Sequence, residues 1–325
     1  MQNRLWLTLA SIPVAMLIAS SPAIAQTEEV ITIKAAPQEK PAIYDEKADA
    51  REQISAAVAK AMKENRRVLV QWGANWCGWC HLLHNTMKSD RELSRKVLYE
   101  YDVVLIDVGR FDKNIELATE FGADLKAHGL PYLTVLDGDG KVIANQDTGS
   151  LEKQDSEEAA HDVAKVMEFL TQHQATPLSA ESVLATGIAE AKKHDKQVFL
   201  HFGAPWCGWC HRLEDWMALE SVAPVLGKNF IDVKIDTDRM IGGQDALTEY
   251  TGGKPSGIPF FAILDGDGKV VVNSFAMPDG GNVGCPWTDE EKAIFARLLK
   301  EHTKIAADQV DAAVALLGPK EEAGR

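Results

Sequence analysis

The chain is poor in cysteine, with only five in 325 residues. Small exported proteins that are held together by disulfides are dense in cysteine, so this composition argues against a stapled framework of that kind. Four of the five cysteines stand in two short motifs, and the fifth, Cys285, stands alone. Such clustering indicates chemistry at the two motifs.

Positive charge is also scarce. The chain has 34 Lys and Arg against 48 Asp and Glu, which gives a formal net charge of −14, and it contains no basic run. This balance argues against nucleic acid or an anionic membrane surface as a partner. We interpret the acidic charge as a source of solubility.

Long apolar runs are absent after the first 25 residues. The start of the chain has a short polar stretch with Arg4, an apolar run over 5–19 and the small-residue ending Ala23-Ile24-Ala25, which is typical of a secretory signal cut after Ala25. A retained anchor is the alternative, but the run is short for a span of about 20 residues. We therefore expect a soluble protein in the periplasm or otherwise secreted, with no stable membrane insertion after cleavage.

The sequence repeats itself at an offset of about 130 residues. The hexapeptide WCGWCH occupies 76–81 and returns unchanged at 206–211. Each copy follows a helical stripe and a short apolar run, at 68–73 and 198–203, which we interpret as a buried strand. A second strand is predicted at 103–107 and again at 230–236.

A glycine-rich turn recurs later in each copy, before the helical stripe that ends it. The sequence Asp-Gly-Asp-Gly-Lys stands between apolar runs at 137–141 and 265–269, and it predicts a hairpin, because Gly and Asp tolerate the positive φ of tight turns. The same residues lack the ligand layout of a calcium loop. Strand-helix-strand followed by a hairpin implies an α/β fold, a central mixed sheet with helices on both faces.

These patterns divide the chain into five parts. We expect a signal peptide (1–25), a flexible leader (26–50), a first domain (51–175), a second domain with an additional C-terminal helix (176–318) and a tail (319–325).

The series of strand, Trp-Cys-Gly-Trp-Cys, helix and a later strand led by proline resembles the thioredoxins in both halves. The resemblance implies two tandem thioredoxin-like domains, with Pro131 and Pro259 in cis peptide bonds against the dithiols. It also implies redox-active disulfides, Cys77–Cys80 and Cys207–Cys210, with no cofactor and no metal.

The expected chemistry is thiol–disulfide exchange. Cys77 and Cys207 would stand at helix N-termini, where free backbone N–H groups favour a thiolate, the form that attacks a disulfide. Cys80 and Cys210, one turn further on, would resolve the mixed disulfide. Oxidised exported proteins are the expected substrates, and the resemblance points to a membrane thiol-electron transporter as electron donor. Reductase, oxidase and isomerase stay open.

Other chemistries use the same residues. An exported CxxCH is also the attachment sequence of c-type haem, although the strands around the motif have no role in that scheme. Zinc needs four ligands at close spacing, which two distant pairs do not supply. Cu(I) on one dithiol remains an alternative, as does a protein that binds clients without turnover.

The two halves differ six residues before the first cysteine, where thioredoxins commonly place a buried acid. Gln71 cannot act as a base, whereas His201 can, and the alternative is that both only satisfy hydrogen bonds under the sheet.

Further residues of each motif are candidates for supporting roles. Trp79 and Trp209 are expected on a surface that contacts substrate, and Trp76 and Trp206 are expected to pack as shields of the site. We interpret His81 and His211 as solvent-facing helix residues, with added positive charge at the site as the alternative. Cys285 is interpreted as a small buried apolar residue, with an exposed regulatory thiol as the alternative.

Overall fold

A computed structural model describes residues 41–154 and 159–318. The predicted signal segment, residues 26–40 of the predicted leader and the predicted tail lie outside the described residues. Among the described residues, no helix is both long and apolar enough to span a bilayer. We call the part from α1 to α6 the first region and the part from α7 to α12 the second region.

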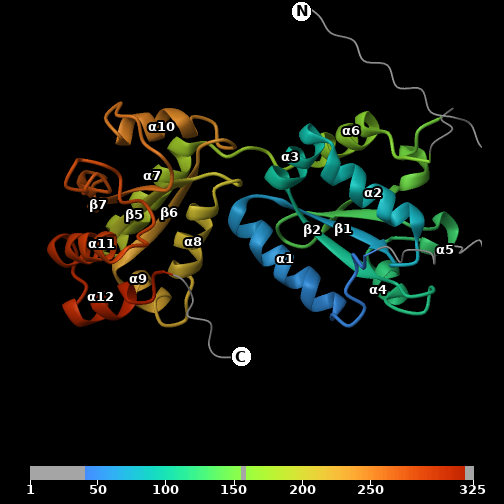
Figure 1. Ribbon diagram of the computed structural model, residues 1–325, viewed down its shortest axis with the longest axis horizontal. Helices are drawn as coiled ribbons and strands as arrows, with labels where there is room; N and C mark the ends of the chain where they lie inside the picture. Colours follow the sequence, from blue (N-terminus) through green and yellow to red (C-terminus); the bar gives the residue numbers. More distant parts are fainter. Residues whose placement is uncertain (1–40, 155–158, 319–325) are drawn as a thin grey trace, which may run out of the picture. The chain divides into compact units, whose positions relative to one another are not determined.

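The first region contains one mixed sheet and its helices (Figure 1). Its elements are, in order, α1 (Ala50–Glu64), β1 (Arg67–Gly73), α2 (Gly78–Ser89), α3 (Arg91–Glu100), β2 (Tyr101–Asp107), α4 (Ile115–Glu120), α5 (Leu125–His128), β3 (Tyr132–Leu136), β4 (Val142–Asp147), the 3-10 turn η1 (Thr148–Leu151) and α6 (Val163–His173).

The second region repeats this plan and adds a helix. Its elements are α7 (Ala180–Lys193), β5 (Gln197–Gly203), α8 (Gly208–Met217), α9 (Ala223–Asn229), β6 (Phe230–Asp236), α10 (Gly243–Tyr250), β7 (Phe260–Leu264), β8 (Val270–Asn273), α11 (Asp289–His302) and α12 (Ala307–Val314). Helix α12 joins the core because Val310, Ala313 and Val314 share one buried face. The predicted boundary between the domains falls between α6 and α7 and stays a prediction.

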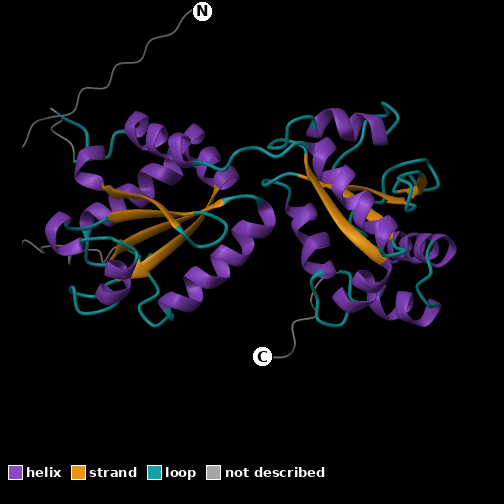
Figure 2. Ribbon diagram, turned by 180° about the vertical axis from the view of Figure 1, so that it is seen from behind, coloured by secondary structure: helices purple, strands orange, loops and turns teal. Residues whose placement is uncertain are grey.

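Each region has a four-stranded sheet, with strand orders β2-β1-β3-β4 and β6-β5-β7-β8. The first pair of strands is parallel in each sheet, and the hairpin strands run antiparallel to their neighbours. Helices cover both faces of each sheet (Figure 2). The predicted α/β fold with a mixed sheet and flanking helices is confirmed.

Side chains of β1 alternate between two cores. Val70 and Trp72 pack towards α1, whereas Leu69 packs with residues of α2 and α6. Each fully buried apolar side chain of this kind contributes about 1.5–3 kcal/mol to folding. The alternation places Gln71 on the face that α2 covers, and the same alternation in β5 places His201 under α8.

The predicted hairpins are present between β3 and β4 and between β7 and β8. The carboxylate of Asp137 accepts hydrogen bonds from the backbone N–H groups of Asp139 and Lys141, at 3.0 and 2.9 Å. Gly140 and Gly268 have φ of +79° and +83°, a conformation that glycine adopts without a steric cost. The repeated sequence therefore specifies the same turn twice.

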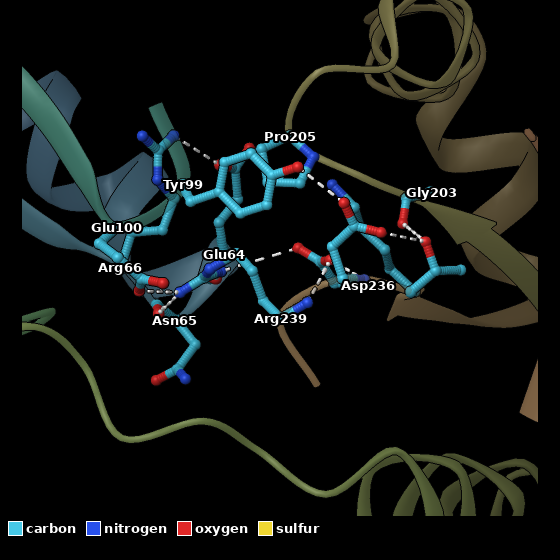
Figure 3. A network of polar contacts seen from close by, with 12 residues as sticks. Glu64, Asn65, Arg66, Tyr99, Glu100, Gly203, Pro205, Asp236 and Arg239 are labelled. Carbon is cyan, nitrogen blue, oxygen red and sulfur yellow. Dashed lines mark hydrogen bonds and ion pairs between the residues drawn. The ribbon is translucent and has the colours of Figure 1, made fainter. Parts of the chain in front are cut away.

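Polar contacts join residues of the two regions (Figure 3). The guanidinium of Arg239 donates hydrogen bonds to the carbonyl oxygens of Glu64 and Asn65, at 2.9 and 2.7 Å, and pairs with Glu100 at 3.1 Å. The Arg239 side chain is only 9% exposed. Several acceptors around a buried arginine reduce the cost of removing its charge from water.

Two glycine substitutions test the packing of the second region. A Cβ on Gly187, inside α7, would lie 2.2 Å from Cγ2 of buried Val233, whereas a Cβ on exposed Gly227, inside α9, would meet nothing within 4 Å. Overpacking costs about 1–3 kcal/mol, and alanine favours a helix over glycine by about 1 kcal/mol. We expect Gly187→Ala to lower the free energy of unfolding in urea and Gly227→Ala to raise it slightly. Equal stability of the two variants would contradict the tight contact.

Candidate active sites

Each hexapeptide joins the end of a strand to the start of a helix. Cys77 is the N-cap of α2, and its Sγ lies 3.1 Å from the backbone N–H of Cys80. Cys207 caps α8 in the same way, with its Sγ 3.1 Å from the N–H of Cys210. The first sulfur therefore faces free N–H groups and the positive end of the helix dipole, which stabilise a thiolate.

The four motif cysteines form two disulfides, Cys77–Cys80 and Cys207–Cys210. The predicted pairing is confirmed. In each pair the first cysteine retains a little exposure, 6% for Cys77 and 3% for Cys207, while the second is almost fully buried. Among the described residues, no group of three or more His, Cys, Asp or Glu side chains is placed to hold a metal ion.

The proline-led strands lie beside the disulfides. The peptide bonds Leu130–Pro131 and Ile258–Pro259 are both cis, as the resemblance implied. The carbonyl oxygen of Ile258 lies 3.6 Å from Sγ of Cys207, and Leu130 packs against the first disulfide. In the second region the backbone of the residue before the proline thus borders the sulfurs, and in the first region that residue packs against them.

Two uncharged side chains, Gln71 and Tyr44, lie under the first disulfide. The side-chain amide of buried Gln71 donates hydrogen bonds to the Tyr44 hydroxyl at 2.6 Å and to the carbonyl oxygen of Cys80 at 3.3 Å. Burial raises the pKa of Tyr44 well above its ordinary value. Tyr44 belongs to the predicted flexible leader, whose last residues, 41–49, the structure instead packs against this site.

A histidine and its carboxylate partner lie under the second disulfide. His201 is 1% exposed, and its Nε2 lies 3.0 Å from Oδ1 of Asp232. Burial alone would raise the pKa of Asp232. The hydrogen bond and charge of His201 lower it by more than burial raises it, so the net shift is downward. His201 therefore has a carboxylate partner, whereas the partners of Gln71 are a hydroxyl and a backbone carbonyl.

An ion pair lies beside the resolving cysteine of the second site. The Nζ of Lys234 is 2.7 Å from Oε1 of Glu214, and both side chains are largely buried. A Cβ built on Gly203 would lie 3.4 Å from Sγ of Cys210 and 3.8 Å from the same Oε1, so the carboxylate borders the sulfur. We did not expect Glu214 from the sequence, although its position four residues after Cys210 puts both on one helix face.

The two outer tryptophans are exposed, which corrects our expectation that they pack as shields. Trp76 is 50% exposed and Trp206 is 58% exposed. Each indole N–H finds an acceptor at the surface, the carbonyl oxygen of Gly109 at 2.7 Å for Trp76 and the carboxylate of Asp238 at 3.0 Å for Trp206. These hydrogen bonds hold the indole rings at the surface beside the motif without burying them.

The histidines after the second cysteine brace the loop. Nε2 of His81 lies 2.8 Å from the carbonyl oxygen of Asn75, and Nε2 of His211 lies 2.9 Å from that of Pro205. His81 is only 5% exposed, so its interpretation as a solvent-facing residue is wrong. His211 keeps a side chain that is 41% exposed. In both regions the ring fixes the chain just before the first cysteine.

The inner tryptophans have different neighbours in the two regions. Trp79 meets the ring of His161 edge to face, with centroids 5.4 Å apart. Trp209, which is 45% exposed, meets Trp287 at 5.3 Å, and Arg212 lies over both rings at 4.5 and 4.6 Å. The predicted contact of Trp79 and Trp209 with substrate stays a prediction.

Cys285 lies in the wall of a hollow of about 590 Å³ beside the second site, with Arg212 and Trp287. It is a free thiol and is partly buried. Burial raises its pKa to about 11. A thiol with that pKa is almost fully protonated at neutral pH, which makes it a poor nucleophile.

Fold and sites together define a protein with two thioredoxin-like regions, each with one CxxC disulfide. Two family models agree: the "Thioredoxin-like domain" model matches residues 54–164, and the Thioredox_DsbH model, described as "Protein of unknown function, DUF255", matches residues 161–312. The chain belongs to the thioredoxin-like superfamily.

Similar proteins include two fungal ones and one solved structure. The chain is 25% identical over 209 residues to protein disulfide-isomerase tigA of Aspergillus niger, covering 62% of this chain and 53% of that protein. It is 26% identical over 201 residues to protein disulfide-isomerase erp38 of Neurospora crassa, covering 62% and 51%. The disulphide isomerase of Xylella fastidiosa Temecula1 is 30% identical, with 40% of this chain and 95% of that chain covered and a TM-score of 0.35. The chain spans about half the length of the curated relatives it matches.

His161 makes the stability of the first region depend on pH. It is 1% exposed, and burial lowers its pKa to about 4. An unfolded histidine has a pKa of about 6.5, so the unfolded chain binds the proton more tightly, and stability falls as the pH drops from about 6.5 to 4. We expect His161→Phe to remove about 1–3 kcal/mol of this acid-dependent loss in urea unfolding measured at pH 7 and pH 4.5. The exposed His128→Phe control should lose stability as the wild type does, and an unchanged loss in His161→Phe would contradict the assignment.

The raised pKa of Cys285 predicts slow alkylation. With both disulfides formed, it is the free thiol among the five cysteines. At pH 8 a pKa of about 11 leaves about one thiolate in a thousand, against about a quarter for an ordinary cysteine. Mass spectrometry should show modification of Cys285 by iodoacetamide at least about 100-fold slower in the folded oxidised protein than in urea. Equal rates would mean that burial does not protect this thiol.

Proposed function

We propose that the chain is a thiol–disulfide oxidoreductase that exchanges electrons with protein substrates through both sites. The observation that carries the proposal is the N-cap position of Cys77 and Cys207, each bonded to a cysteine one helical turn further on. This geometry stabilises a thiolate on the first sulfur and keeps a second sulfur within bonding distance of it.

The reaction has two steps in each site. In the first region, the thiolate of Cys77 attacks a substrate disulfide, forms a mixed disulfide and releases one substrate thiolate. The thiolate of Cys80 then attacks the Cys77 sulfur, which restores the Cys77–Cys80 disulfide and releases the second substrate thiolate. The substrate gains two electrons and the site loses two. The reverse sequence oxidises a substrate dithiol.

Substrates are proposed to bind in extended form beside the cis prolines. The carbonyl oxygen of Ile258 borders Cys207 and Leu130 packs against the first disulfide, and backbone beside a cis proline can pair with an added strand. The exposed rings of Trp76 and Trp206 enlarge the apolar surface next to the cysteines. Oxidised exported proteins would be the substrates, in the compartment that the N-terminal sequence predicts. A membrane thiol-electron transporter would regenerate the dithiols, since an oxidising compartment supplies no reductant of its own.

Cysteine variants test this function. The wild type should accelerate the reduction of insulin by dithiothreitol, followed by turbidity. The acceleration should be smaller in Cys77→Ser and in Cys207→Ser and absent in the double variant, because serine cannot form the mixed disulfide. Cys285→Ser is the matched control and should keep wild-type activity, since that thiol is protonated and outside both pairs. An inactive wild type that retains copper after purification would favour the dithiol metal-binding alternative.

A further inference from the structure

A polar anchor holds residues 41–49 against the first site only. Oδ1 of Asn75, two residues before Cys77, accepts hydrogen bonds from the backbone N–H groups of Ile43 and Tyr44, both at 2.9 Å. Nδ2 of Asn75 donates to the carbonyl oxygen of Tyr44 at 3.0 Å. The second region has Pro205 at the position of Asn75, and proline has no side-chain polar group to form such an anchor.

The anchor places a phenol beside the resolving cysteine. Tyr44 is 3% exposed and packs in one cluster with Cys77 and Cys80. A Cβ on Gly73 would lie 2.1 Å from the Tyr44 hydroxyl oxygen and 2.7 Å from Sγ of Cys80, so both atoms border the same small space, which exists because Gly73 has no side chain. The hydroxyl thus lies next to a sulfur that reacts.

The direction of the hydrogen bonds leaves the Tyr44 proton free for that sulfur. The hydroxyl oxygen accepts from Nε2 of Gln71 at 2.6 Å, so the O–H itself is the remaining donor. Burial raises the pKa of Tyr44, which keeps the phenol protonated at neutral pH. A neutral donor next to a sulfur stabilises the thiolate more than the thiol.

We propose that Tyr44 is a catalytic residue of the first site, whose hydroxyl donates a hydrogen bond to the Cys80 sulfur when that sulfur is a thiolate. The proposal rests on thiol–disulfide exchange at this site. When a donor thiolate attacks the Cys77 sulfur, the Cys77–Cys80 bond breaks and its electron pair leaves on Cys80, where Tyr44 stabilises it. In the other direction, Tyr44 raises the fraction of Cys80 thiolate that attacks the mixed disulfide on Cys77 and expels the bound thiolate.

The second site has no such donor among the described residues. The group that borders Cys210 there is the carboxylate of Glu214, paired with Lys234. A carboxylate accepts a proton and does not donate one when ionised. The influence of Tyr44 is therefore confined to the first site, which gives the experiment an internal comparison.

The test follows the resolving step with 5,5′-dithiobis(2-nitrobenzoate) as the disulfide. In reduced full-length protein with Cys207→Ser, Cys210→Ser and Cys285→Ser, attack by Cys77 releases one thionitrobenzoate and attack by Cys80 releases the second. We expect Tyr44→Phe to raise the midpoint of the pH profile of the second release by about one unit and to slow that release about tenfold at pH 7. The first release should change less than twofold. An unchanged profile, or equal slowing of both releases, would overturn the proposal.

Two further variants separate the hydrogen bond from folding. Asn75→Ala loosens the anchor without removing the phenol, so it should shift the midpoint of the pH profile of the second release in the same direction. Circular dichroism checks that each variant is folded. Tyr44→Phe in a protein with Cys77→Ser and Cys80→Ser should leave both releases of the second site unchanged, and a change there would contradict a local role. The reagent measures the reactivity of the cysteines without a protein substrate. If the wild type fails to reduce insulin but Tyr44→Phe still shifts the pH profile, the proposed function is refuted and the role of Tyr44 is not.

Discussion

Both sites depend on one hydrogen bond, from the backbone N–H of the second cysteine to the sulfur of the first, at 3.1 Å in each region. This bond makes the first cysteine the N-cap of a helix and places its sulfur at the positive end of the helix dipole. The neighbouring glycines and histidines support the geometry of this bond. Gly73 and Gly203 end the preceding strands without a Cβ, so the helix start can approach the sheet. The histidine after each pair holds the loop by the carbonyl of residue 75 or 205.

The identical hexapeptides lie over different side chains because the strand residue that faces each cysteine-bearing helix is Gln71 in the first region and His201 in the second. Residues 71 and 201 necessarily face the cysteine-bearing helix. In the first region Gln71 bonds Tyr44, a residue from outside the repeat, and both side chains are uncharged. In the second region the histidine pairs with Asp232, and Glu214 pairs with Lys234. A sulfur that faces a hydroxyl donor and a sulfur that faces a carboxylate differ in how easily they lose a proton.

Much of the fold could be predicted from the sequence, because local patterns specify it: apolar runs mark β1 and β5, and Asp-Gly-Asp-Gly-Lys specifies both hairpins. The pairing of cysteines followed from family resemblance. Tyr44 could not be predicted, since its segment has no periodicity and its partners, Gln71 and Asn75, lie far along the chain. The exposure of Trp76 and the burial of His81 were also not predicted. The backbone carbonyl that accepts from the Trp76 indole belongs to Gly109, far along the chain, and the one that His81 contacts belongs to Asn75, in the loop before the helix.

Two dithiols in one chain raise a question of driving force. Electrons pass between them in a preferred direction only if their reduction potentials differ, and identical motifs on identical helix starts supply no difference. Stabilising one thiolate by about one pKa unit corresponds to about 1.4 kcal/mol, or about 30 mV for a two-electron couple. The surroundings of Cys80 and Cys210 differ between the two regions, with a phenol near one sulfur and an ion pair near the other. The groups beneath the sulfurs, which lie outside the repeated hexapeptide, are therefore a source of a difference in potential that the identical motifs do not supply.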